Sequence, residues 1–155
     1  MKKINRTDLI ISVVFAELVG AVSALLSGSF KGVYAELTRP PFSPPAWLFP
    51  VVWSVLYALM GISAYIISKS EKRERHNALK IYFLQLAVNF LWSILFFRFM
   101  LLKLSAVTAV VLAVLVAMMI YSFFRINRTA GLLNIPYFVW TVFASYLAIG
   151  TAVLN

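Results

Sequence analysis

The chain contains no cysteine, a single histidine and only five acidic residues among its 155. Without cysteine, disulfides and thiolate chemistry are excluded. The histidine, His76, lies in a charged stretch, where a solvated side chain is expected. A histidine-ligated haem or zinc centre inside the apolar segments is therefore not expected. The sequence predicts neither a metal site nor a bound cofactor.

Charge of either sign is also scarce, because charged residues make up 12% of the chain and hydrophobic residues 63%. Such a chain is too apolar for a soluble domain of this size. The hydrophobic blocks are continuous and do not alternate with polar residues, which favours helices over barrel strands. Each block is about long enough to cross a bilayer. The sequence predicts an all-α integral membrane protein, one domain over 1–155, with five transmembrane helices at about 9–28, 46–68, 78–98, 103–124 and 131–154.

Four prolines precede the second of these helices: Pro40, Pro41, Pro44 and Pro45. Proline has no N–H to donate and restricts the residue before it, so this stretch is predicted to be extended and stiff. We therefore expect a long first loop at about 29–45. A long ordered loop usually covers something, and this loop is expected to form a lid.

Basic residues are divided unevenly between the two ends of the predicted helices. One end receives Lys2, Lys3, Arg6, Lys69, Lys72, Arg73, Arg75, Lys80, Arg125 and Arg128. The other end receives only Lys31, Arg39, Arg98 and Lys103. The positive-inside rule then places the N-terminus in the cytoplasm, and the first loop and the C-terminus outside. Topology accounts for the net charge of +9, so no nucleic-acid partner is expected.

Glu17 lies about midway along the first predicted helix, where a carboxylate is costly in lipid. It should face the bundle or a wet cavity. Two readings stay open, a functional carboxylate and a neutral or hydrogen-bonded one, because no second acid in the apolar blocks could form a relay with it. Small residues further along the same helix suit close helix contact: Gly20, Ala21, Ser23, Ala24, Ser27 and Gly28.

Three tryptophans lie too deep for an interfacial belt. At 1.5 Å per residue, Trp53 is roughly 10 Å below the outer boundary, Trp92 and its helix neighbour Asn89 roughly 12–16 Å, and Trp140 near the midplane, whereas Trp47 fits the belt. Ordinary helix packing and a shared aromatic pocket both explain this pattern. A pocket of this kind beneath the first loop would accept a flat, largely apolar ring system, with any acidic groups near the loop cations.

Three segments of the sequence follow one another in a characteristic order and spacing: PPFSPPAWLFPVVWSVLYALMG at 40–61, VNFLWSILFF at 88–97 and PYFVWTVFASYLAIGTAVLN at 136–155. Together they resemble the translocator protein / tryptophan-rich sensory protein family. The resemblance implies a five-helix bundle, commonly a homodimer, and a bacterial-type member in the cytoplasmic membrane. It also implies a cavity beneath the first loop that accepts protoporphyrin IX and isoquinoline-carboxamide or benzodiazepine-type drugs.

The resemblance further implies roles for particular residues. Tyr34 and Pro44 would form the lid and rim, Trp53 and Trp140 the walls, and Asn89 the polar contact. The full set of ligand-binding residues expected in this way is Ala24, Tyr34, Pro44, Phe49, Trp53, Tyr57, Asn89, Phe90, Trp140, Ala144 and Leu147.

Four functions remain open at this point. The leading hypothesis is a membrane receptor or sensor that binds tetrapyrroles, with membrane lipid and a second copy of the chain as its other partners. A second is light- and oxygen-dependent porphyrin degradation with Trp53 and Trp140 as the catalytic residues, although no metal site or acid/base pair supports an enzyme. The alternatives are a transporter of porphyrins or other flat hydrophobic ligands, with Glu17 as a coupling group, and a purely structural membrane protein.

Overall fold

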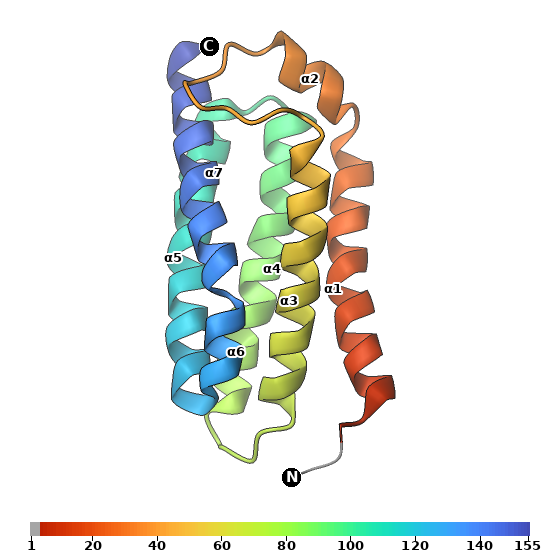
Figure 1. The fold of residues 1–155 in the computed structure, drawn as a ribbon. Coiled ribbons are helices and arrows are strands. Elements are labelled where there is room, and N and C mark those ends of the chain that lie inside the picture. Colours follow the sequence, from red (N-terminus) through yellow and green to blue (C-terminus); the bar gives the residue numbers. More distant parts are fainter. Residues whose placement is uncertain (1–3) are drawn as a thin grey trace.

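The structure, a computed structural model, describes residues 4–155, so Lys2 and Lys3 of the charge comparison lie outside the described residues. Long helices run side by side along one bundle axis, and both α2 and the C-terminus lie at the same end (Figure 1). No strand occurs between residues 4 and 155. The helices are α1 (Arg6–Ser27), α2 (Phe30–Glu36), α3 (Leu48–Ser68), α4 (Arg75–Phe97), α5 (Leu102–Ile126), α6 (Arg128–Leu133) and α7 (Ile135–Leu154).

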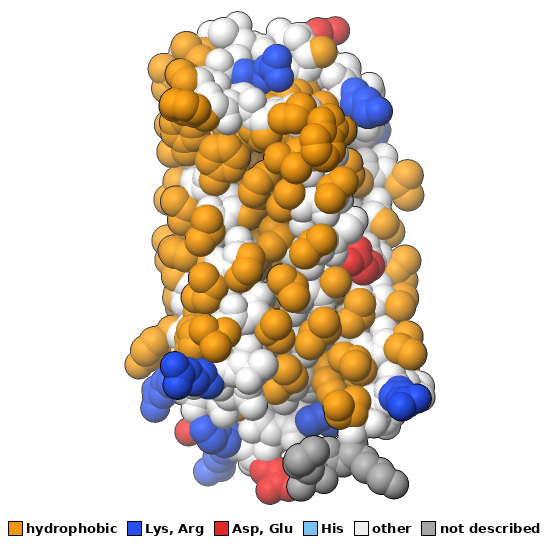
Figure 2. All heavy atoms as spheres, in the orientation of Figure 1, with side chains coloured by type: hydrophobic (Ala, Val, Ile, Leu, Met, Phe, Trp, Pro, Cys, Tyr) orange, Lys and Arg blue, Asp and Glu red, His pale blue; other side chains and the backbone are white. Residues whose placement is uncertain are grey.

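Five segments of the described chain are long and apolar enough to cross a membrane: α1, α3, α4, α5, and α6 together with α7. This confirms the prediction of an all-α integral membrane protein. Hydrophobic side chains cover the middle of the bundle, while Lys and Arg gather toward its two ends (Figure 2). In the bilayer the backbone bonds internally within each helix, which is why continuous apolar blocks fold this way.

The segment expected to be a loop over 29–45 differs from that expectation, because Phe30–Glu36 form helix α2. No side chain caps its start, and aromatic burial stabilises it instead. The rings of Phe30 and Tyr34 stack with centroids 5.7 Å apart, and the ring of Phe49 on α3 packs edge-on against both. The remainder of the α1–α3 connection (residues 28–47) is non-helical, and all four of its prolines lie there, as predicted.

Four hydrogen bonds fasten the α1–α3 connection across the end of the bundle. The hydroxyl of Tyr34 donates to the carbonyl of Pro44, and the hydroxyl of Tyr146 on α7 donates to the carbonyl of Pro41 at 2.8 Å. The side-chain amide of Asn155 pairs with both backbone groups of Thr38, at 3.0 Å and 2.8 Å. The connection is therefore fixed both to itself and to α7.

The last predicted helix, at about 131–154, is divided in the structure at Asn134. Pro136 has no N–H for the carbonyl of Leu132, and its ring would collide with that carbonyl in a continuous helix. The side-chain amide of Asn134 donates to Oγ of Ser63 on α3 at 2.8 Å, which ties the division to the bundle. Hydropathy alone did not indicate a division, because the apolar block is unbroken.

α1 is the most peripheral span, since only 11% of its most apolar window is buried, against 33–39% for the other spans. The backbone of α1 meets that of α3 at Gly61. A Cβ added to Gly61 would lie 2.5 Å from Cα of Val13, and Oγ of Ser12 donates to the Gly61 carbonyl at 2.7 Å. The two backbones thus touch directly, which requires the missing side chain.

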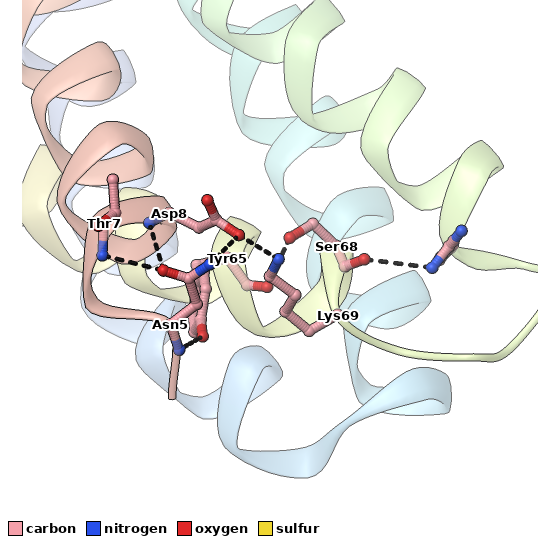
Figure 3. A network of polar contacts seen from close by, with 7 residues as sticks. Asn5, Thr7, Asp8, Tyr65, Ser68 and Lys69 are labelled. Atoms are coloured by element: carbon pink, nitrogen blue, oxygen red, sulfur yellow. Dashed lines mark hydrogen bonds and ion pairs between the residues drawn. The ribbon is translucent and has the colours of Figure 1, made fainter. Parts of the chain in front are cut away.

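A polar network holds the beginning of α1 against the end of α3 (Figure 3). Asn5 caps α1 by accepting from the N–H groups of Thr7 and Asp8 at 3.1 and 3.3 Å, and its own N–H donates to the hydroxyl of Tyr65 at 2.9 Å. Lys69, just after α3, forms an ion pair with Asp8. The hydrogen bond from Lys69 to Asp8 raises the pKa of the lysine above its ordinary value.

We expect Gly61→Ala to lower the thermal unfolding temperature of the protein in detergent. Its new methyl group would meet the α1 backbone, and overpacking of this kind costs about 1–3 kcal/mol. Ala117→Val, which also adds carbon atoms but at an exposed position of α5, is the control. An unfolding temperature for Gly61→Ala equal to that of the control would contradict the close contact.

Candidate functional site

A cavity of about 550 Å³ lies between α1, α3 and α4, in the half of the bundle nearest α2. Its volume falls within the range of roughly 300–1,000 Å³ that is usual for small-molecule sites. It is lined by Glu17, Gly20, Ala21, Ser23, Ala24, Ser27, Ser29, Phe30, Lys31, Phe49, Pro50, Trp53, Ser54, Tyr57, Asn89, Trp92, Ser93 and Phe97. The cavity is half open, and several lining positions on α1 and α3 are exposed, so it is reached from the side of the bundle.

Aromatic rings form the wall on the α3 and α4 side. The ring of Trp53 lies 5.7 Å from that of Tyr57 and 6.4 Å from that of Trp92, centroid to centroid. Tyr57 reaches α1 at Gly20, where an added Cβ would collide with its ring. Glycine at this position therefore lets the tyrosine ring lie against α1 and close the deep end of the cavity.

Most polar groups around the cavity already have partners. Oγ of Ser23 donates to the carbonyl of Phe90 at 2.9 Å, and the hydroxyls of Ser27 and Ser93 are 2.8 Å apart. These bonds join α1 to α4. In contrast, Nε1 of the buried Trp92 has no hydrogen-bond partner in the described structure.

Asn89 connects the cavity wall to the interior of the bundle. Its Nδ2 donates to the hydroxyl of Tyr137 on α7 at 3.0 Å, and that hydroxyl donates to Oε1 of Gln85 at 2.6 Å. All three side chains are buried. The chain of bonds fixes the orientation of Asn89, whose Oδ1 is not used by these bonds.

The structure brings together five of the residues expected to bind a ligand. Ala24, Phe49, Trp53, Tyr57 and Asn89 all line the cavity. They come from three helices, α1, α3 and α4. Ala24 belongs to the small-residue surface that was predicted on α1, so part of that surface lines the site.

The other expected residues lie elsewhere. Tyr34, Ala144 and Leu147 line a separate pocket of about 30 Å³ beneath the α1–α3 connection, which Phe49 also borders. Pro44, Phe90 and Trp140 line neither pocket.

Trp140 is kept from the cavity by α3. Its ring packs against Phe49 at 5.8 Å and against Phe143 at 5.6 Å, so Phe49 lies between it and the open space. Tyr137, one turn earlier on α7, meets Trp53 at 6.2 Å. Spacing along α7 puts Trp140 and Ala144 on one face but does not say which helix that face meets.

Thirteen of the lining residues were absent from the expected set, although a sequence signal existed for several of them. On α4, Trp92, Ser93 and Phe97 follow Asn89 at helical spacing and share its face. On α3, Ser54 directly follows Trp53 and carried no separate signal.

Metal chemistry finds no support in this site. Within residues 4–155, no group of three His, Cys, Asp or Glu side chains could hold a metal ion. Glu17 is the sole acid among the lining residues, so a pair of carboxylates for acid/base catalysis is also missing there.

Comparison with known proteins shows which family has this sequence pattern. The family model described as the TspO/MBR family matches residues 11–154. The chain belongs to the TspO/MBR family. This confirms the resemblance drawn from the proline-rich and tryptophan-containing segments.

Individual TspO/MBR relatives are similar over most of their length. The chain is 35% identical to the tryptophan-rich protein TspO of Chlorobaculum tepidum over 124 residues, 79% of this chain and 78% of that protein. With the tryptophan-rich protein TspO of Archaeoglobus fulgidus it shares 34% identity over 149 residues, 90% and 97% of the two chains. The translocator protein of Bos taurus is 32% identical over 117 residues, 74% and 69%.

The buried chain behind the cavity wall leads to a stability prediction. Tyr137→Phe should lower the free energy of unfolding by about 1–3 kcal/mol, because it leaves the amides of Gln85 and Asn89 without their shared partner. Thermal unfolding in detergent would measure the loss. Tyr121→Phe is the control, since its ring is exposed on α5 and its hydroxyl has no hydrogen bond to the described chain. Equal unfolding temperatures for the two variants would contradict the proposed role of the network.

Proposed function

We propose that this member of the TspO/MBR family is a membrane receptor or sensor that binds a flat, largely apolar ligand in the cavity between α1, α3 and α4. Tetrapyrroles such as protoporphyrin IX, and drugs of the isoquinoline-carboxamide or benzodiazepine type, are the proposed ligands. The observation that carries the proposal is the cavity of about 550 Å³ with Trp53, Tyr57 and Trp92 along one wall. Flat π-faces of this kind stack favourably on a planar ring system.

The charge at the α2 end of the cavity fits the same class of ligand. Lys31 lines the cavity where α2 begins, and it is exposed. An ammonium group there would attract the carboxylates of a porphyrin that lay with its ring between α1 and α3. The hydroxyls of Ser29 and Ser54 add hydrogen-bonding groups for a polar ligand edge.

The proposed contacts separate into two groups. Ala24, Phe49, Trp53, Tyr57 and Asn89 would touch the ligand directly. The remaining six expected residues would act by supporting the cavity end of the bundle: Tyr34, Pro44, Phe90, Trp140, Ala144 and Leu147.

We further propose that the protein lies in the bacterial cytoplasmic membrane as a homodimer, with its N-terminus in the cytoplasm. The end of the bundle that holds the α3–α4 connection carries most of the basic residues. The end that holds α2 and the C-terminus carries few, and the positive-inside rule places this end outside. The cavity would then open in the outer half of the membrane.

Quenching of tryptophan fluorescence by protoporphyrin IX in detergent tests the proposal. We expect saturable quenching that Trp53→Phe weakens by about fivefold in affinity, since one aromatic contact is worth about 1 kcal/mol. Ala24→Phe, which adds a ring to the wall opposite, should weaken it further. Trp140→Phe and the exposed Trp47→Phe should each change the affinity by less than about twofold. Linear, unsaturable quenching in every variant would mean that porphyrin only partitions into the micelle.

Light-dependent porphyrin degradation is the second candidate, because the Trp53 indole lines the cavity. On illumination in air, the wild type should form a product with a spectrum distinct from that of porphyrin mixed with free tryptophan. Trp53→Phe should abolish that product, whereas Trp140→Phe should retain it, since Phe49 separates Trp140 from the cavity. Equal loss of the product in both variants would contradict the proposal that Trp53, which lines the cavity, is closer to the ligand than Trp140.

Transport of the same ligands is the alternative function. The half-open side of the cavity along α1 and α3 favours it, because a transported ligand must enter and leave. Uptake of protoporphyrin IX into liposomes that was no faster with the protein than without it would exclude this function.

A further inference from the structure

Glu17 is a charged group without a partner inside a membrane-spanning helix. It lies in α1 and lines the cavity, and its carboxylate makes no hydrogen bond or ion pair with the described chain. Acidic atoms are visible partway along the bundle among hydrophobic side chains, away from the charged ends (Figure 2). A carboxylate at this depth is costly unless something in the cavity bonds to it.

The surroundings of Glu17 offer no cation. Tyr57, on the facing helix, also lines the cavity. The next lining residues on α1 are Gly20 and Ala21, which have no polar side chain. Lys31 is the sole cation among the lining residues, and the helical rise between Glu17 and the end of α1 already separates them by about 15 Å.

The cavity is therefore polarised along its length. A carboxylate lines the end of the cavity farther from α2 and an ammonium group lines the end nearer α2, with aromatic rings between them. An ionised carboxylate only accepts hydrogen bonds, so its natural partner is a donor that also carries positive charge. Charge-assisted hydrogen bonds between N–H and carboxylate are roughly twice as strong as neutral ones, and the low-dielectric surroundings strengthen them further.

We infer that Glu17 determines specificity in the cavity by selecting flat hydrophobic ligands that carry a cationic N–H group. The aromatic wall of Trp53 and Tyr57 would bind the ring, and the Glu17 carboxylate would accept the N–H. This inference rests on the proposed function of the cavity as the ligand site. It adds to that function a ligand class, organic cations, that the aromatic wall alone does not select.

A matched pair of probes tests the inference in purified protein in a non-ionic detergent. 9-Aminoacridine is a cation at neutral pH, and acridine is a neutral molecule with the same three-ring skeleton. The wild type should bind 9-aminoacridine at least about tenfold more tightly than acridine, and Glu17→Gln should reduce this ratio to about one. Glu17→Asp, which keeps the charge, should retain most of the preference.

Glu74→Gln is the control, because it removes the same charge from an exposed side chain at the other end of the bundle. A preference for 9-aminoacridine that survived in Glu17→Gln would overturn the inference. An equal loss in Glu74→Gln would also overturn it, because overall charge would then explain the preference. Protoporphyrin IX, measured in parallel, tests the proposed function separately: wild-type protein that selects 9-aminoacridine through Glu17 but does not bind the porphyrin would refute the tetrapyrrole proposal alone.

Discussion

The lack of hydrogen-bonding partners in the hydrocarbon layer is the constraint on which the rest of this structure depends. A polar side chain in a span is stabilised when it finds its partner inside the protein. Ser27 bonds to Ser93, Asn89 to Tyr137, and Asn134 to Ser63, so each of these pairs joins two helices. These polar residues thus act as links between helices, and the apolar residues fill the space between the links.

These links are not distributed evenly over the helices. α3, α4 and α7 are joined in the interior through Asn89, Tyr137 and Asn134, whereas α1 packs from outside with little of its surface buried. It comes closest to α3 at Gly20 and Gly61, where an added Cβ would collide with the other helix. The cavity is the space between α1 and the helices α3 and α4. The site therefore exists because α1 does not pack closely against these two helices along its whole length.

The sequence was sufficient for the five spans, which depend on hydropathy, and for the absence of helix at the four prolines. It was insufficient where helices meet. Periodicity showed that Trp140 and Ala144 share a face, but the rotation of α7 against α3 decides that Phe49 lies between Trp140 and the cavity. In the same way, α2 forms because the rings of Phe30 and Tyr34 pack against the ring of Phe49 on α3. This contact joins two separate segments, so local helix propensity does not predict it.

The four hydrogen bonds that fasten the α1–α3 connection across the end of the bundle affect how a ligand reaches the cavity. Entry through that end would require Tyr34, Tyr146 and Asn155 to release their partners, whereas the side along α1 and α3 is already open. A ligand that takes the open side comes from the lipid, where a hydrophobic molecule is enriched over water. Occupancy would then follow the amount of ligand dissolved per unit of bilayer, so diluting the sample with empty vesicles would compete with the protein for its ligand.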